Sequence, residues 1–249
     1  RAVNGGVDLL IFPELSLTGY QVQDLVPEVA IRTAPDDTVF STLLEQSRRL
    51  DIMFGFVHED SRQRFYIAAA YLSGGECLHI HHKIYLPTYA MFDEGRYFDA
   101  GEQVRAFDTR FGRVGMAICE DFWHVCAAYT LWLDGADMLI LTSSSPGRGL
   151  ATEQKIGSAR WVEHINQAYA SMFTNFILHT NRTGFEDGEP TAILASDTSP
   201  LFGQITVRGN LVESGPGKIY DFGPGIPAVL RTFNPAKFTG ITGATITGA

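Results

Sequence analysis

The chain has 249 residues, 45% of them hydrophobic and 19% charged, and its mean hydropathy is near zero at +0.01. This composition can bury the core of a large globular domain and is not biased toward disorder. The formal net charge of −9 argues against binding to nucleic acid or to anionic membranes. The three cysteines exclude a disulfide scaffold, and no apolar run is long enough for a transmembrane helix. We therefore expect a cytoplasmic protein with one domain over residues 1–249, in which residues 239–249 carry no pattern that assigns them a structure.

Apolar runs bounded by turn residues or polar clusters predict short strands along the chain. Two of these runs flank the turn Ser73-Gly74-Gly75 and predict an antiparallel pair. Near the C-terminal end, Arg208-Gly209-Asn210 is a hairpin signal between two further runs. The predicted strands are 7–12, 52–57, 65–72, 77–84, 114–118, 138–141, 176–179, 204–207, 211–213 and 228–233.

Three helices are predicted between these strands. An acidic pair at 36–37 precedes hydrophobic residues at helical spacing as far as Leu50, and acidic side chains at that end suit the helix dipole. Residues 123–133 predict a second helix, and Thr152 opens a third whose apolar residues recur at three- and four-residue steps as far as Met172. The alternation of strands and helices predicts an α/β fold with some antiparallel pairing.

The polar residues that end the strands are the informative feature. Glu14, Lys83 and Cys119 each follow a predicted strand, and a Ser-rich turn with Ser144 and Ser145 follows another. In open α/β sheets ligands bind beyond the carboxyl ends of the strands, so these side chains are candidates for one site. Attack by a thiol needs a base to take its proton and a cation where the carbonyl oxygen becomes negative. Each residue alone has an ordinary structural explanation, but together they compose this mechanism.

Three motifs in this order resemble those of the carbon–nitrogen hydrolase (nitrilase) superfamily, and three ordered motifs of this length are a specific signal. The similarity covers residues 7–233, and residues 91–94 and 119–121 resemble the glutaminase portion of glutamine-dependent NAD synthetases. We find no ATP-binding synthetase portion, which favours a stand-alone amidase-like enzyme. The motifs are residues 11–20 around Glu14, 82–89 around Lys83 and 115–123 around Cys119, with 181–186 as a later match.

The resemblance implies a four-layer αββα sandwich, usually assembled as dimers or higher homo-oligomers, whose first strand would lie before residue 1. It implies Glu14 as general base, Lys83 as oxyanion stabiliser and Cys119 as nucleophile. It further implies the backbone N–H of Glu120 as a second oxyanion donor, and Glu94 as a second glutamate beside the lysine.

The implied reaction is hydrolysis of a non-peptide carbon–nitrogen bond in a linear amide, through a cysteine thioester, with release of ammonia or an amine. No cofactor is implied. Glutamine, an N-carbamoyl amine, an ω-amide and a nitrile remain open as substrates, and the second glutamate favours an amide. Relatives contact substrate at the positions of Tyr89, Trp123, Ser144 and Ser145, although packing on the following helix explains Trp123 equally well.

Two other interpretations stay open. Cys77, His79 and His81 alternate and so share a strand face, which would suit a zinc-dependent hydrolase, but such positions spread over about 13 Å. A catalytically impaired or truncated relative that acts as a binding protein is the non-enzymatic alternative. It is motivated by the first strand that the resemblance would place before residue 1 and by the Gly/Thr/Ala-rich tail at 239–249.

Overall fold

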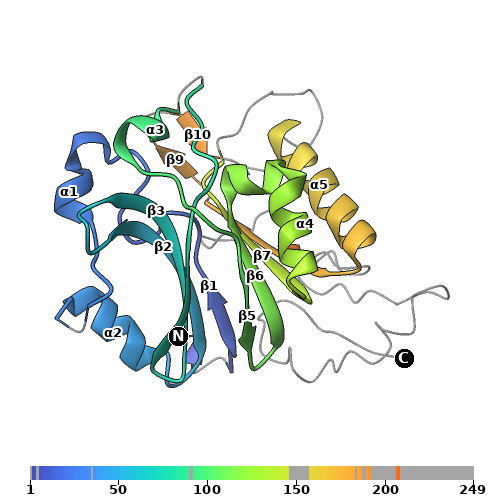
Figure 1. The fold of residues 1–249 in the computed structure, drawn as a ribbon, viewed down its shortest axis with the longest axis horizontal. Helices are drawn as coiled ribbons and strands as arrows, with labels where there is room; N and C mark the ends of the chain where they lie inside the picture. The colour runs from blue at the N-terminus through green and yellow to red at the C-terminus, as the bar shows by residue number, and fades with distance from the viewer. Residues whose placement is uncertain are drawn as a thin grey trace.

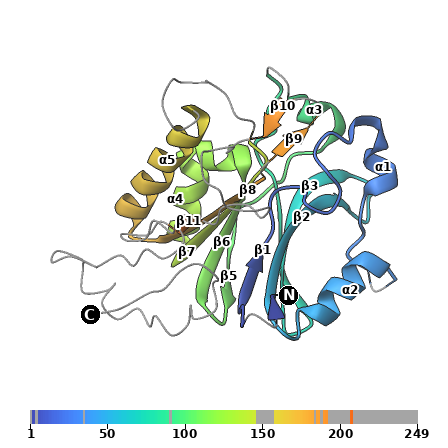
Figure 2. The same cartoon turned by 180° about the vertical axis from the view of Figure 1, so that it is seen from behind.

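The structure is a computed structural model that arranges the chain in four layers (Figures 1 and 2). Two sheets face each other, α2 covers the outer face of the first sheet, and α4 and α5 cover the outer face of the second. This confirms the predicted αββα sandwich. The structure describes residues 2–3, 6–34, 36–89, 92–145, 157–182, 184–186, 189–191 and 206–207.

The first sheet has the strand order β1-β2-β3-β4. β1 runs parallel to β2, and the other neighbours are antiparallel. Its strands are β1 (Leu9–Ile11), β2 (Asp51–Glu59), β3 (Phe65–Ser73) and β4 (Glu76–His82).

The second sheet has the order β11-β8-β7-β6-β5, with a parallel centre and an antiparallel strand at each edge. A separate two-stranded sheet joins β9 to β10. These strands are β5 (Ala106–Thr109), β6 (Gly112–Ile118), β7 (Met138–Ser143), β8 (Phe176–Asn181), β9 (Gly184–Glu186), β10 (Glu189–Thr191) and β11 (Thr206–Val207).

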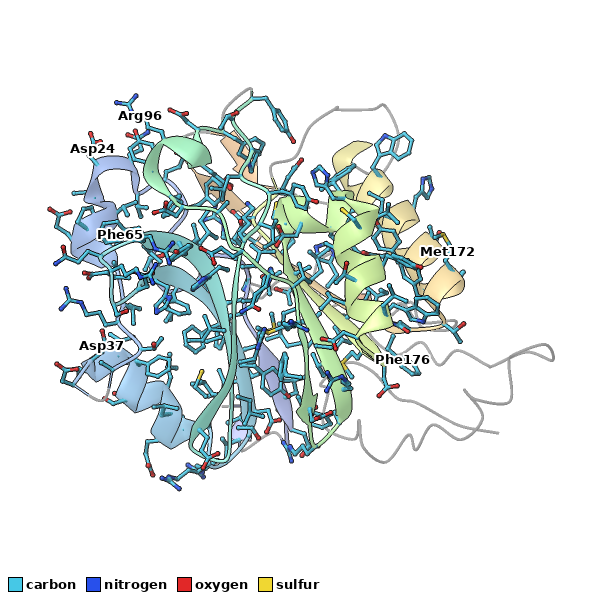
Figure 3. The ribbon with its side chains drawn as sticks, in the orientation of Figure 1. Asp24, Asp37, Phe65, Arg96, Met172 and Phe176 are labelled. Carbon is cyan, nitrogen blue, oxygen red and sulfur yellow. The ribbon has the colours of Figure 1, made fainter. Side chains whose placement is uncertain are left out.

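Two of the predicted helices begin at or near the expected residues. α2 begins where the acidic pair predicts it, and the Asp37 carboxylate accepts bonds from the N–H groups of Val39 and Phe40 (Figure 3). The predicted helix at 123–133 starts two residues later than expected, because Trp123 ends a separate 3₁₀ turn. The helices are η2 (Gln23–Leu25), α1 (Val26–Val29), α2 (Thr38–Gln46), α3 (Glu94–Tyr97), η3 (Cys119–Trp123), α4 (Val125–Leu133) and α5 (Gly157–Phe173).

Three hydrophobic clusters fill the three spaces between the layers. β2 shows why its sequence is apolar on both faces: Met53 and Val57 pack in the central cluster between the sheets, while Phe54 and Phe56 pack in the outer cluster with α2. Successive side chains of a strand point to opposite faces, so a strand covered on both sides has no polar alternation. The unbroken apolar runs of the sequence are the consequence.

The sequence patterns missed some elements and placed others outside the described residues. β5 and α3 were not predicted, since each has four residues and too few positions to show a period. Thr152, the hairpin at 208–210, the strands at 211–213 and 228–233, and residues 239–249 lie outside the described residues, as does any strand before residue 1. None of the helices in the described ranges has the length and hydropathy that a bilayer span requires.

Candidate active site

Glu14 lies in a turn after β1 that packs directly on β2. The N–H of Leu17 donates to the Gly55 carbonyl at 3.1 Å, and Leu15 adopts a φ of 48°, which residues with a side chain seldom do. A methyl group on Gly55 would lie 2.4 Å from the Leu15 nitrogen and 2.7 Å from the Pro13 carbonyl oxygen. Only glycine lets this turn approach so closely, and the approach buries the Glu14 carboxyl group.

Lys83 follows β4, and its side chain is fully buried. Its backbone N–H donates to the Ile67 carbonyl and its own carbonyl accepts from Gly101, both at 2.8 Å. Its ammonium Nζ donates to Glu14 Oε1 and to Glu94 Oε1, each at 2.8 Å. Burial alone would lower the pKa of Lys83, but the neighbouring acidic groups, Glu14 first, outweigh it and raise that pKa. The side chain is therefore an ammonium held by two carboxylates.

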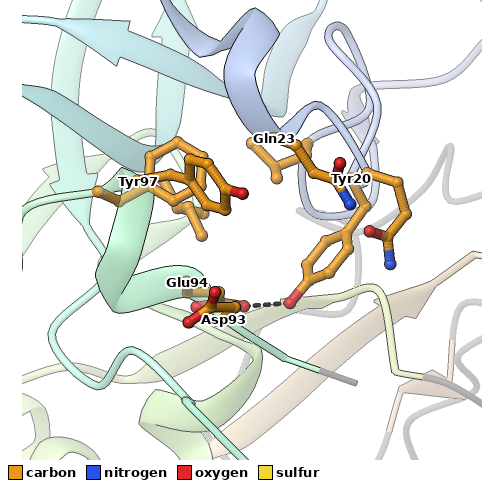
Figure 4. A pocket seen from close by; sticks show the side chains of 9 residues that line it. Tyr20, Gln23, Asp93, Glu94 and Tyr97 are labelled. Carbon is orange, nitrogen blue, oxygen red and sulfur yellow. Dashed lines mark hydrogen bonds between the residues drawn. The ribbon is translucent and has the colours of Figure 1, made fainter.

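Glu94 opens α3, in the stretch that shows no periodicity in the sequence. Its Oε1 accepts from Lys83 and from the Tyr20 hydroxyl, while its buried Oε2 has no hydrogen-bond partner among the described residues. Burial is the main cause that raises the pKa of Glu94 to about 7, against the opposing effect of Lys83. A small pocket of about 100 Å³ adjoins this carboxylate, with Tyr20 and Tyr97 in its wall (Figure 4).

Cys119 is the first residue of η3, directly after β6. Its φ of 45° is left-handed, so the chain turns sharply at this residue, a strained conformation that occurs at functional sites. Its Sγ lies 3.6 Å from Ser145 Oγ. Burial, reinforced by the charge of Glu14, raises the pKa of the Cys119 thiol to about 12. The resting side chain is a thiol, which needs a base when it reacts.

The two residues that follow β7 contact both Glu14 and Cys119. The Ser144 N–H donates to Glu14 Oε2 at 2.7 Å, and the next residue, Ser145, carries the hydroxyl beside Cys119. Ser145 is held in turn by Asn181, whose side-chain oxygen accepts from the Ser145 N–H at 3.0 Å. The structure thus brings Glu14, Lys83, Cys119 and Glu94 together with both serines of the Ser-rich turn.

Glu120, Tyr89 and Trp123 lie nearer the surface. The Tyr89 hydroxyl donates to Glu120 Oε2 at 3.0 Å, and His124 lies 3.7 Å from the other oxygen of that carboxylate. Tyr89 is 52% exposed and Trp123 is 43% exposed. Trp123 ends η3 just before α4 and belongs to none of the three hydrophobic clusters of the described residues.

A family model described as carbon-nitrogen hydrolase matches residues 1–208. The chain belongs to the carbon–nitrogen hydrolase family. It is similar to the glutamine-dependent NAD(+) synthetase of Thermotoga maritima, with 33% identity over 69% of this chain and 30% of that protein. The same enzyme of Aquifex aeolicus is 31% identical over 82% of this chain and 35% of that protein. The chain spans about a third of the length of these curated relatives.

Solved structures agree with this assignment. The glutamine-dependent NAD+ synthetase of Acinetobacter baumannii has a TM-score of 0.60 at 27% identity, covering 80% of this chain and 34% of that one. A mutant amidase from Nesterenkonia sp. AN1 has a TM-score of 0.66 at 19% identity, covering 84% of this chain and 73% of that one. In that amidase the acetamide moiety of fluoroacetamide is bound covalently to the active-site cysteine. The fold is that of the carbon–nitrogen hydrolases.

Sequence reasoning missed several residues that hold this carbon–nitrogen hydrolase site together. Asn181 opens the later motif, but its bond to the turn at Ser145 is visible only in three dimensions. Tyr20 closes the glutamate motif and reaches Glu94 from 74 residues away. Asp121, two residues after the cysteine, accepts four hydrogen bonds.

The zinc interpretation fails on the geometry of β4. The pairing of β3 with β4 shifts register between Tyr71 and Leu72, whose partners are His79 and Cys77. The shift breaks the alternation, so Cys77 packs with the outer cluster while His79 stacks on Phe107 of the central cluster, with ring centroids 4.6 Å apart. The described residues include no group of three His, Cys, Asp or Glu side chains that could hold a metal ion.

The raised pKa of the Cys119 thiol makes a prediction about its alkylation. Iodoacetamide reacts with the thiolate, so the rate constant at Cys119 should rise about tenfold per pH unit between about pH 7 and pH 9, without a plateau. Mass spectrometry after cleavage at Glu120 separates this cysteine from the exposed Cys126, which is the internal control for the reagent. A plateau below about pH 8 would instead show a thiolate that forms before substrate binds.

Proposed function

We propose that this protein hydrolyses the carboxamide of a small amide, with glutamine as the preferred class of substrate, through an acyl thioester on Cys119. The observation that carries the proposal is the buried ammonium of Lys83 between two carboxylates. The thiol of Cys119 lies close enough that the charges of these groups shift its pKa. These groups match the base, the cation and the nucleophile that thiol attack on an amide requires.

In the first step Glu14 takes the proton of Cys119 while Sγ attacks the amide carbon. A base is needed because a thiol with a pKa of about 12 is almost entirely protonated at neutral pH. The Ser144 N–H fixes one oxygen of Glu14 and Lys83 fixes the other, so the carboxylate cannot turn away. This preorganisation favours proton transfer along one direction.

The tetrahedral intermediate carries a negative oxygen that needs hydrogen-bond donors. Lys83 Nζ is one candidate, and the backbone N–H of Glu120 is the other, because the first N–H groups of a helix have no partner within the helix. Loss of one such donor typically lowers the rate by a factor on the order of 10² to 10³.

Collapse of the intermediate breaks the carbon–nitrogen bond. Glu14, now protonated, gives its proton to the leaving nitrogen, ammonia departs, and the acyl group stays on Cys119 as a thioester. Glu14 then takes a proton from the water that attacks the thioester, and it gives this proton to Sγ as the acid leaves, which restores the thiol and the carboxylate. Glu94 keeps the ammonium in place, and its Oε2 is available to accept a bond from the amide N–H₂ of the substrate.

The preference for glutamine rests on the rim of the site and on the relatives. Glu120 follows the nucleophile, and its carboxylate is oriented by Tyr89, which suits an ammonium group on the substrate. The similar NAD(+) synthetases are glutamine-dependent by name. A nitrile or an N-carbamoyl amine that lacks an α-ammonium group would offer this carboxylate no cation.

The test is ammonia release from a panel of glutamine, asparagine, other ω-amides, a carbamoyl amine and a nitrile. Cys119→Ala should abolish release and Lys83→Met should lower it by a factor on the order of 10³ or more, since both act on the transition state. Cys126→Ala, at an exposed cysteine, is the matched control and should keep full activity.

Full activity in Cys119→Ala would refute the nucleophile, and full activity in Lys83→Met would remove the lysine from the reaction. No release from any compound by the unaltered protein would favour the binding-protein interpretation.

We also propose that the protein forms a homo-oligomer through the outer face of α4 and α5. Leu133 and Trp161 are each 63% exposed there, and Trp132 is partly exposed and stacks on Tyr129. Met172 lies on the outer side of α5 (Figure 3). An apolar face of this kind is typical of an interface. Light scattering should give at least the mass of a dimer and a smaller mass for Leu133→Glu, whereas a monomer in the unaltered protein would contradict the proposal.

A further inference from the structure

We propose that Asp121 is a positioning residue of this site, whose carboxylate sets where Lys83 stands relative to Cys119. The inference rests on the proposed function. Asp121 touches neither the thiol nor the ammonium in the structure; it acts through the chain that carries them.

The Asp121 carboxylate accepts hydrogen bonds from residues on both sides of Lys83. Asp121 Oδ1 accepts from the backbone N–H groups of Ile84 at 2.9 Å and Tyr85 at 3.0 Å, the two residues after Lys83. Asp121 Oδ2 accepts from His81 Nε2 at 2.8 Å, two residues before Lys83. The lysine is therefore held at the point where the chain leaves β4.

The same carboxylate also holds the nucleophile. Asp121 Oδ2 accepts from the backbone N–H of Ile118 at 3.1 Å, and Ile118 immediately precedes Cys119. This bond spans the cysteine and closes the turn in which its φ reaches 45°. A left-handed backbone conformation is unfavourable for a residue with a side chain, and it persists where the surrounding contacts fix it.

These contacts connect the two sheets. Lys83 leaves β4 of the first sheet and Cys119 leaves β6 of the second, and the carboxylate bonds to the chain beside both. Its four bonds use the whole accepting capacity of an ionised carboxyl group. A shift of either segment would break at least one hydrogen bond of the fully buried Asp121 carboxylate. The cost of an unsatisfied buried group therefore opposes movement of Lys83 relative to Cys119.

The protonation states follow from the donors. Three partners are backbone N–H groups, which can only donate, and an ionised carboxyl group with a hydrogen on His81 Nε2 satisfies all four contacts. Burial acts to raise the pKa of Asp121, but the bond from His81 and the other donors outweigh it and lower that pKa. The same donors therefore favour the ionised form of this carboxyl group.

Asp51 provides a matched control elsewhere in the fold. It is also a buried aspartate with several donors: the hydroxyls of Tyr71 and Ser73 at 2.8 Å each, and Arg110 Nε at 3.0 Å. None of these partners belongs to the proposed site. Asp51→Asn should therefore lower stability without misplacing the lysine or the cysteine.

The test compares Asp121→Asn with Asp51→Asn in kcat, KM and unfolding temperature on the best amide of the panel. A misplacement on the order of 1 Å costs a factor of about 10² in rate, so kcat of Asp121→Asn should fall by about that factor while KM changes little. Asp51→Asn should keep kcat, measured well below its unfolding temperature. Equal losses of kcat in the two variants at matched stability would reduce Asp121 to an ordinary structural residue and overturn the proposal.

His81 supplies a second pair of variants, useful if Asp121→Asn does not fold. His81→Gln keeps an N–H donor at the position of Nε2, so this variant should keep most of kcat. His81→Leu removes the donor, so its kcat should fall as in Asp121→Asn. Equal activity in both variants would show that the bond to Asp121 does not position the site.

Alkylation of Cys119 separates this inference from the proposed function, because it needs no turnover. If the carboxylate positions Lys83 beside the thiol, Asp121→Asn moves a cation away and the iodoacetamide rate constant at Cys119 falls, by about tenfold for each unit by which the thiol pKa rises. The rate constant in Asp51→Asn should stay unchanged. An unaltered rate constant in Asp121→Asn would overturn the positioning role, even in a protein that hydrolyses amides.

Discussion

The burial of one ammonium group between two carboxylates is the interaction on which the site depends. Removal of a charge from water costs several kcal/mol, and Lys83 is fully buried. Glu14 and Glu94 compensate for this loss, each at 2.8 Å. Because a buried charge without its partner is strongly unfavourable, the contacts that join the turn after β1, the exit of β4 and the start of α3 compensate for the burial of Lys83.

The rest of the fold makes this meeting possible. Two apolar sheets pack face to face. The site residues lie in the segments that directly follow the C-terminal ends of β1, β4, β6 and β7. Gly55 lets the Glu14 turn lie directly on β2, and the end of β7 supplies the N–H that holds the second oxygen of Glu14. Cys119 lies on a strained turn directly after β6, where the charges of Glu14 and Lys83 act on its thiol.

Much of the fold and three residues of the candidate site could be predicted because their signals are local in the sequence. Apolar runs indicated the long strands, and three motifs indicated Glu14, Lys83 and Cys119. Asp121 was invisible as a positioning residue, since three of its four partners lie 36 to 40 residues away in the chain and three of the four are backbone N–H groups, which any residue type except proline supplies. The bulge in β4 was likewise invisible, because a single shift of register leaves no mark on composition.

The state of the Lys83 ammonium tests the central claim most directly. The chain has four lysines, so ¹⁵N NMR of protein with labelled lysine side chains gives few signals, and Lys83→Met assigns the one of interest. The account predicts that the Lys83 Nζ signal keeps the shift of an ammonium group up to and above about pH 10.4, where a free lysine in solution is half deprotonated. A Lys83 signal that titrates at or below that pH would contradict the account, because an ammonium buried between two carboxylates cannot lose its proton so easily.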